Sequence, residues 1–162
     1  MDANFEHKYR KSRQNGTIYV TTRSPVSPER QKELDSGAGE LYLNGIQREY
    51  TVDQIMQVAH MLGDVYKLRF KIDFSGESRG FAYLQYIADH NMECMMDILT
   101  LRFKLASLSI KVFPSRNIKR LLLHNVEHLT PVQVYQKLRH ICHFAKLVAD
   151  ELIHQGDKCS AF

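Results

Sequence analysis

The spacing of apolar and polar residues predicts four β-strands between residues 41 and 112. The clearest run alternates apolar with basic residues: Tyr66, Lys67, Leu68, Arg69, Phe70, Lys71 and Ile72. A period of two puts the two sets of side chains on opposite faces of a sheet, so this strand buries its apolar set and exposes its basic set. Similar alternation predicts strands at 41–46, 79–86 and 107–112, the last with Leu108, Ile110 and Val112 inward.

Two helices are predicted between these strands. The first begins at a capping box formed by Thr51 and Gln54 and ends near Gly63, and the second begins at Asp89. Their core-facing residues recur at helical spacing: Ile55, Ala59 and Leu62, then Met92, Met95, Met96 and Leu99. The order β-α-β-β-α-β predicts an α+β fold of the ferredoxin-like, split βαβ type, a four-stranded antiparallel sheet with two helices on one face.

The third predicted strand carries a sequence motif. Residues 79–86, RGFAYLQY, satisfy each defined position of RNP1: a basic residue, Gly, an aromatic, a small residue, an aromatic, an aliphatic, any residue and an aromatic. Residues 41–46, LYLNGI, stand roughly forty residues upstream and fit its partner motif, RNP2. Together they predict an RNA-recognition motif, whose sheet stacks unpaired bases on exposed rings.

The same alternation places the motif side chains on the sheet. One face of the third strand carries Phe81, Tyr83 and Gln85, and one face of the first carries Tyr42 and Asn44. Aliphatic residues take the opposite faces, so the rings are predicted to stand on the open face, where a stacked base contributes about 1–3 kcal/mol. Phosphates would be attracted by the basic residues Arg79, Lys67, Arg69 and Lys71.

Residues 64–83, DVYKLRFKIDFSGESRGFAY, resemble the first RNA-recognition motif of the heterogeneous nuclear ribonucleoprotein R and Q family. That family includes the complementation factor of apolipoprotein B mRNA editing and the germline protein Dead end. The similarity spans roughly Tyr9 to Val126, and Gln14-Asn15-Gly16 matches an Asn-Gly extension of the family. The resemblance implies base stacking by Tyr42, Phe81 and Tyr83 and a backbone contact by Arg79. A small germline member would fit a chain this short.

Residues 1–38 are predicted to form a basic extension, a β-hairpin followed by a linker. Asn15-Gly16 favours a type I′ turn, and the β-branched run 17–21 follows it. A hairpin packed beside the domain would lengthen the RNA path with Lys8, Arg10, Lys11 and Arg13; alternatively, this arm is unpacked and binds phosphates non-specifically. Residues 23–39 are interpreted as linker, and phosphorylation of Ser24 or Ser27 there would weaken RNA binding.

The predicted RNA-recognition motif covers residues 39–115, and residues 116–162 are predicted to be a partial, degenerate second copy. Residues 121–126, LLLHNV, stand where its RNP2 would lie, with Leu122 in place of the stacking aromatic. A helix is predicted from Pro131 to Cys142, with one side formed by Val134, Leu138 and Ile141.

No second RNP1 follows in the sequence, so we expect this copy to lack two strands and one helix. Either a longer natural chain completes it, or its elements dock on the first motif and bury Leu121 and Leu123.

Composition and charge narrow the function classes. The net charge of +4 favours an acidic partner such as RNA. No P-loop, G-x-S-x-G or HExxH motif occurs, so we expect no enzyme activity, no cofactor and no small-molecule substrate. Neither a membrane-spanning segment nor a signal peptide is expected, which predicts an intracellular protein, cytoplasmic and/or nuclear.

The cysteines and histidines predict neither disulfides nor a metal site. Cys94, Cys142 and Cys159 are widely spaced without a CxxC pair, as is typical of reduced thiols. Five histidines gather in the last third: His124, His128, His140, His143 and His154. Their spacing lacks the paired ligands of a tetrahedral zinc site.

Two functions from different classes remain open. The favoured one is single-stranded RNA binding at mRNA 3′ untranslated regions, with regulation through protein partners of a ribonucleoprotein or silencing complex. The alternative is a protein-interaction adaptor with weak RNA affinity, whose partners bind the helical face and the C-terminal segment. Its candidate contact residues are Cys94, Ile98 and Leu122.

Overall fold

The computed structural model describes residues 7–116, 122–123, 128–141, 150–154 and 157–161, of which 122–123 and the residues after 141 are described by their backbone alone. The chain divides into two compact units, Met1–Arg116 and Asn117–Phe162. Each unit is described by itself.

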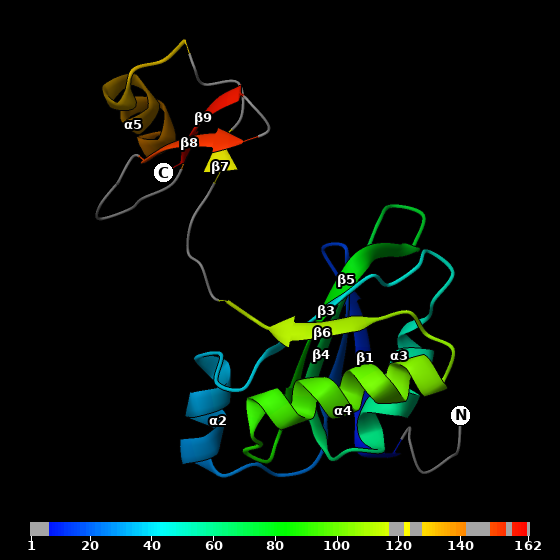
Figure 1. The fold of residues 1–162 in the computed structure, drawn as a ribbon. Coiled ribbons are helices and arrows are strands. Elements are labelled where there is room, and N and C mark those ends of the chain that lie inside the picture. Colours follow the sequence, from blue (N-terminus) through cyan, green and yellow to red (C-terminus); the bar gives the residue numbers. More distant parts are fainter. Residues whose placement is uncertain (1–6, 117–121, 124–127, 142–149, 155–156, 162) are drawn as a thin grey trace. The chain divides into compact units, whose positions relative to one another are not determined.

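The first unit is built on a six-stranded antiparallel sheet with the order β1-β2-β4-β5-β3-β6 (Figure 1). Its strands are β1 (Tyr9–Gln14), β2 (Thr17–Thr22), β3 (Leu41–Asn44), β4 (Val65–Ile72), β5 (Ser78–Tyr86) and β6 (Lys111–Pro114). Its helices are α2 (Pro28–Asp35), α3 (Val52–His60) and α4 (Met92–Leu105). Elements β3 to β6 follow the predicted β-α-β-β-α-β order, and β1 and β2 widen the predicted four-stranded sheet beyond β4.

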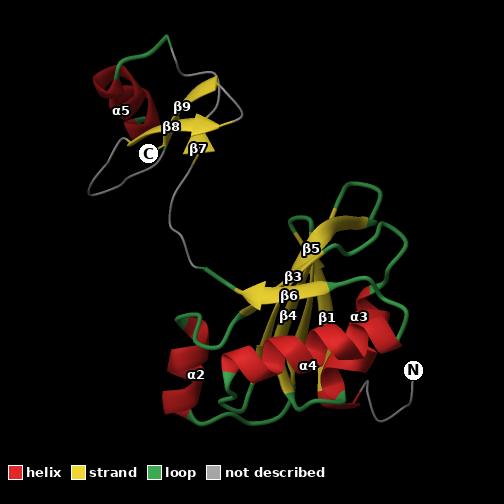
Figure 2. Ribbon diagram, in the orientation of Figure 1, coloured by secondary structure: helices red, strands yellow, loops and turns green. Residues whose placement is uncertain are grey.

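Helices α3 and α4 cover one face of this sheet (Figure 2). The core between them contains fully buried side chains from both layers: Leu43, Ile55, Leu68, Leu84, Leu99 and Phe103. Burial of each such side chain contributes about 1.5–3 kcal/mol. The inward assignments of β3, β4 and β5 are confirmed by this core, except at Tyr66. Tyr66 lies beside the register shift between Val65 and Lys67, and its hydroxyl donates to Asp35 of α2 at 2.9 Å.

The predicted capping box at the start of α3 forms. The backbone N–H of Gln54 donates to Thr51 Oγ1 at 3.3 Å, and the Thr51 N–H donates to Gln54 Oε1 at 2.8 Å. The predicted cap of α4 is wrong, because the N-cap residue is Asn91 and not Asp89. The Cys94 N–H in the first turn donates a hydrogen bond to Asn91 Oδ1 at 3.0 Å.

The hairpin β1–β2 is packed onto the sheet, so the alternative of an unpacked arm does not hold. Asn15 and Gly16 have φ of 48° and 66°, the left-handed pair that a type I′ turn requires. Strand β2 pairs with β4 from Thr17 to Thr21. Tyr9 of β1 is buried, and its hydroxyl accepts a hydrogen bond from the Val65 N–H at 3.3 Å.

The interpretation of residues 23–39 as a linker is wrong over its middle part, which forms α2. Ser27 Oγ accepts from the Arg30 N–H at 3.3 Å, and Pro28 takes the first helical position. Serine at the N-cap and proline after it are helix-start signals, so the Ser-Pro step begins a helix here. Leu34 of α2 is 1% exposed, which fixes the helix against the unit.

The second unit has the element order β7 (Leu122–Leu123), α5 (Pro131–Arg139), β8 (Asp150–His154) and β9 (Asp157–Ala161). Its sheet order is β7-β9-β8, the arrangement of the first three strands of an RNA-recognition motif, as β3-β5-β4 are arranged in the first unit. The expectation that two strands are missing is therefore wrong, since three strands form. Only the second helix and the fourth strand have no counterpart among the described residues.

Helix α5 is shorter than the sequence predicted. It begins at a capping box between Thr130 and Gln133 and ends at Arg139, and Ile141 beyond its end is 80% exposed. Val134 is 2% exposed and supplies the buried side of the helix. Other residues named in the sequence analysis lie outside the described part: Leu121, His124, Cys142 and His143.

Candidate nucleic-acid interface

The face of the first unit's sheet away from α3 and α4 carries the three predicted aromatic rings. The ring centre of Tyr42 lies 6.0 Å from that of Phe81 and 5.5 Å from that of Tyr83, and the last two are 6.0 Å apart. All three side chains are half-buried, so each keeps exposed ring surface. We refer to Tyr42, Phe81 and Tyr83 as the ring platform, which offers adjoining surfaces on which bases can stack.

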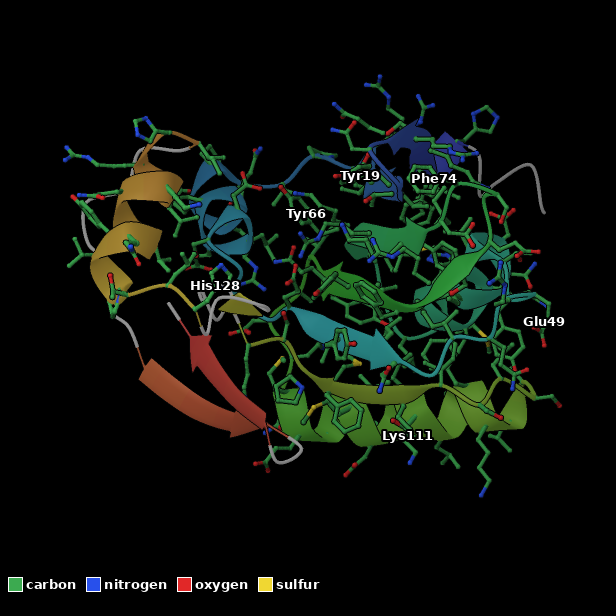
Figure 3. The ribbon with its side chains drawn as sticks, turned by 90° about the horizontal axis from the view of Figure 1, so that it is seen from above. Tyr19, Glu49, Tyr66, Phe74, Lys111 and His128 are labelled. Atoms are coloured by element: carbon green, nitrogen blue, oxygen red, sulfur yellow. The ribbon has the colours of Figure 1, made fainter. Side chains whose placement is uncertain are left out.

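Strand register extends this platform into a transverse row across all six strands. In this row each residue is paired with the next one on the adjacent strand, in the order Ser12, Tyr19, Arg69, Tyr83, Tyr42 and Phe113. Two aromatic residues of this row were not predicted as site residues: Tyr19, labelled in Figure 3, and Phe113. Phe113 is 43% exposed. Continuing the alternation past the inward Val112 would have placed Phe113 on the open face.

A depression of about 400 Å³ lies on the platform beside β6. Its walls are the rings of Tyr42, Tyr83 and Phe113 and the segment that leaves β6: Pro114, Ser115 and Arg116. A concave surface with three rings and a guanidinium can enclose a planar base while the cation faces its phosphate.

Arg69 lies across one of the platform rings. Its guanidinium carbon is 4.5 Å from the centre of the Tyr83 ring, a cation–π distance. Its Nη2 donates to Glu40 Oε1 at 2.6 Å, and the other carboxylate oxygen of Glu40 accepts from the Ser115 hydroxyl at 2.8 Å. Arg69, predicted as a phosphate contact, is thus held by a carboxylate on the platform.

Gln85 is not part of the exposed surface, contrary to the sequence analysis. It is 3% exposed, and its amide donates to the backbone carbonyls of Leu34 at 2.8 Å and Ala38 at 3.1 Å. Alternation directs Gln85 to the open face as predicted, but α2 and the turn after it cover that end of the face. Lys67 lies at the same end, 3.6 Å from the carboxylate of Asp35.

Basic groups gather at the other end of the open face. Lys71 Nζ donates to Thr17 Oγ1 at 2.9 Å. Burial lowers the pKa of Lys71, and the positive charges of Arg69 and Arg79 lower it further. A cluster of like charges that depresses a lysine pKa is relieved by an anion, so this end is suited to a phosphate.

Arg79, Asn44 and Lys111 complete the exposed polar groups around the platform. The Arg79 guanidinium carbon lies 5.6 Å from the Phe81 ring centre. Asn44 is exposed and faces Phe81 on one side and Lys111 on the other. Lys111 was not predicted as a site residue, although its position two residues before Phe113 puts it on the same face.

The four predicted basic residues of the hairpin are divided between the two faces. Lys8 pairs with Asp64, and Lys11 pairs with Asp53 at the start of α3, so Lys11 faces the helices. Arg10 faces Thr21, a neighbour of Lys67 on the open face. Arg13 lies at the hairpin tip. Neither Arg10 nor Arg13 forms an ion pair within the described residues.

The predicted partner residues on α4 are exposed on the side of the unit that bears the helices. Cys94 is exposed and Ile98 is 40% exposed. Leu101 and Leu105, which the sequence analysis did not name, continue the same side of the helix and are 56% and 70% exposed. Nothing is described of the third predicted residue, Leu122, beyond its backbone in β7.

Within the part of the chain that the structure describes, no helix combines the length and apolar character needed to cross a bilayer. The same part contains no group of three or more His, Cys, Asp or Glu side chains arranged to hold a metal ion.

The chain is similar to proteins that are named for RNA binding. Residues of this chain match human RNA-binding protein 47 with 33% identity over 51 residues, which is 32% of this chain and 9% of that protein. Human probable RNA-binding protein 46 matches with 30% identity over 60 residues, 37% of this chain and 11% of that protein. The fold and the two motifs of the first unit are those of an RNA-recognition motif, and these similarities agree with them.

A longer similarity relates the chain to one further protein. Protein tumorous testis of Drosophila melanogaster is 47% identical over 137 residues, which cover 83% of this chain and 60% of that protein. Residues 121–156 match a family model described as the protein tumorous testis C-terminal domain. The chain thus spans about 60% of the length of this relative. The match to the C-terminal domain falls within the second unit.

Proposed function

We propose that the first unit binds single-stranded RNA on the ring platform. The observation that carries this proposal is the cluster of Tyr42, Phe81 and Tyr83, whose ring centres lie within 6.0 Å of one another on a half-exposed sheet face. Rings grouped on a core face would be buried, whereas these retain stacking surface. The basic groups at the edges supply the sequence-independent attraction to phosphates.

The RNA proposed is messenger RNA, bound at 3′ untranslated regions. The protein would regulate translation, stability or processing by bringing effector proteins to the message, in the cytoplasm, the nucleus or both. Support comes from the resemblance to the ribonucleoprotein R and Q family and from relatives named RNA-binding proteins 46 and 47. The second unit, on a different part of the chain, is a candidate surface for those effectors.

The test is the affinity for short fluorescent RNAs that are U-rich, A-rich or mixed in sequence. The wild-type chain is compared with the Phe81→Ala, Tyr83→Ala double variant, and Leu101→Ala on α4 serves as the matched control. Two stacked bases contribute about 2–6 kcal/mol, so the double variant should lose at least 30-fold in affinity while the control keeps it. Affinity that is absent, or equal in the wild type and a folded double variant, would contradict the proposal.

A second function, protein binding by α4, is favoured by one specific observation. Its outer face shows an apolar stripe at intervals of four, three and four residues: Cys94, Ile98, Leu101 and Leu105. This is the spacing of a helix–helix seam. The first turns carry Glu93 and Asp97 and the last carry Arg102 and Lys104. We infer that the occupant is an amphipathic helix of a partner protein with basic residues opposite Glu93 and Asp97.

The two functions use opposite sides of the unit, so substitutions should separate them. Ile98→Asp and Leu101→Asp place charges in the stripe and should abolish capture of effector proteins while leaving RNA affinity unchanged. The ring variants should do the reverse. Loss of RNA binding in a folded Leu101→Asp chain would count against two separate surfaces.

A further inference from the structure

We propose that the hairpin tip and the β4–β5 loop form a further nucleotide pocket, in which a base stacks on Phe74 and its phosphate lies between Arg13 and Arg79. This inference rests on the RNA-binding function proposed above and extends its path beyond the ring platform. The structure has a depression of about 580 Å³ at this place, lined by these three residues and by Asn15 and Asp73. That volume lies within the range of small-ligand sites.

Phe74 is the aromatic element of the pocket. Its side chain is fully exposed, at 108%, beside the hairpin strands (Figure 3). The loop that presents it is held by hydrogen bonds from the Asp73 N–H to the Glu77 carbonyl at 2.9 Å and from the Gly76 N–H to the Asp73 carbonyl at 3.2 Å. A ring displayed on a fixed loop is ready to stack a base without first being ordered.

The opposite wall is fixed to the sheet by the turn of the hairpin. The Gly16 carbonyl accepts from the Ile72 N–H at 2.9 Å, at the end of β4. The guanidinium of Arg13 lies along the loop, since a Cβ atom on Gly76 would be 3.6 Å from its Nη1. Hairpin and loop therefore form two walls of one pocket, and the hairpin contributes a phosphate-binding group to it.

The charge of the pocket suits a phosphate. Within the described residues, Arg13 and Arg79 form no ion pairs. The acidic groups Asp73 and Glu77 are both bound by Arg48. Since these carboxylates already have a cationic partner, the guanidinium groups of Arg13 and Arg79 are left to attract an anion.

The pocket adjoins the ring platform through Arg79. The same guanidinium that lines the pocket lies 5.6 Å from the Phe81 ring centre. An RNA strand whose bases stack on the platform would pass Arg79 before it reaches Phe74. Asn15 in the pocket wall adds an amide that can hydrogen-bond to a base edge. The pocket is thus predicted to be filled only by RNAs longer than the platform itself holds.

The experiment measures affinity for mixed-sequence single-stranded RNAs of graded length, from about four to about ten nucleotides, the range of single-domain sites. Phe74→Ala is compared with Leu105→Ala, another exposed apolar residue, and Arg13→Ala with Arg102→Ala, another exposed arginine. Phe74→Ala should lower the affinity for the longer RNAs roughly fivefold to a hundredfold and leave the affinity for the shortest RNAs unchanged. Arg13→Ala should lower the affinity for the longer RNAs and reduce the slope of log affinity against log salt by about one.

The Tyr42→Ala variant separates failure of this pocket from failure of the proposed function. Suppose that Tyr42→Ala lowers the affinity for RNAs of every length. If Phe74→Ala then lowers none of the affinities, or lowers them equally at all lengths, the pocket proposal is overturned while RNA binding on the platform stands. If Tyr42→Ala has no effect at any length, RNA binding on the platform fails, and the pocket proposal fails with it. Circular dichroism checks that each variant is folded.

Discussion

The guanidinium of Arg69 lies over the ring of Tyr83, 4.5 Å from its centre, and is held there by the carboxylate of Glu40. One ring surface of the platform is therefore in contact with a cation before RNA arrives. A base that stacks on that surface must displace Arg69, or lie on the guanidinium itself. Glu40 thus controls how much of the basic charge on the open face is available.

Replacing Glu40 by glutamine should raise RNA affinity. The change removes a negative charge and frees Arg69 to bind a phosphate, so we expect a gain of about threefold to tenfold and a salt slope steeper by about one. Fluorescence anisotropy at several salt concentrations measures both. Glu93→Gln on α4 makes the same charge change far from the platform and should have little effect. A loss of affinity in Glu40→Gln would show that Glu40 holds Arg69 in its RNA-binding position.

RNA affinity should fall at alkaline pH through Lys71. The pKa of Lys71 is lowered from 10.5 by burial and by Arg69 and Arg79, and only its protonated form attracts phosphate. As the pH rises through this lowered pKa, the charge is lost earlier than from an ordinary lysine, and affinity decreases. Burial raises the pKa of Tyr42, so its phenol stays neutral to a higher pH than that of an ordinary tyrosine.

Titration of an A-rich RNA between about pH 7 and about pH 10 measures this effect. Lys71→Arg keeps the charge throughout, so its affinity should change less with pH than that of the wild type. An identical pH profile in the two proteins would rule out Lys71 as the responsible group.

Removing the Gln85 amide should loosen α2. Gln85→Ala removes the amide that donates to the carbonyls of Leu34 and Ala38, of which Leu34 keeps a donor in the Gly37 N–H at 3.0 Å. Loss of a buried partner costs about 1–3 kcal/mol in the free energy of unfolding. Hydrogen exchange of the α2 amides should become faster. Gln57→Ala on the exposed side of α3 is the matched control. Unchanged exchange in α2 would mean that Leu34 alone holds the helix.

Gly16 in the hairpin turn and Gly39 after α2 have nearly equal φ, +66° and +65°. Alanine at either position has a left-handed backbone strain of about 1–2 kcal/mol. At Gly16 the added Cβ would also lie 3.2 Å from the Ile72 carbonyl oxygen, whereas at Gly39 it meets no atom within 4 Å. Urea unfolding should therefore show a larger loss for Gly16→Ala. Equal losses would mean that the turn shifts away from β4 at no cost.

The features that sequence predicted well are those fixed by neighbouring residues. Alternation at 66–72 and 79–86 assigned the inward and outward side chains because the strand period is two, except at Tyr66 beside the register shift of β4. The capping box of Thr51 and Gln54 and the turn at Asn15-Gly16 are likewise determined within four residues. Local rules were enough for the platform rings.

The features that sequence did not predict depend on contacts between distant segments. Gln85 is on the predicted face, yet Leu34 lies 51 positions away in sequence and covers it. The pairing of Arg69 with Glu40 joins residues 29 positions apart. The exposure of Phe74 follows from the fixed loop around it. Phe113, by contrast, could have been found by extending the fourth strand's alternation.

The most direct test of RNA binding on the open face is an NMR titration of the ¹⁵N-labelled chain with a short U-rich single strand. Binding on the platform predicts that amide resonances shift in β3, β5 and β6, around Tyr42, Phe81 and Phe113, while those of α4 keep their positions. Shifts confined to the outer face of α4, or none under conditions in which the RNA binds, would contradict the account.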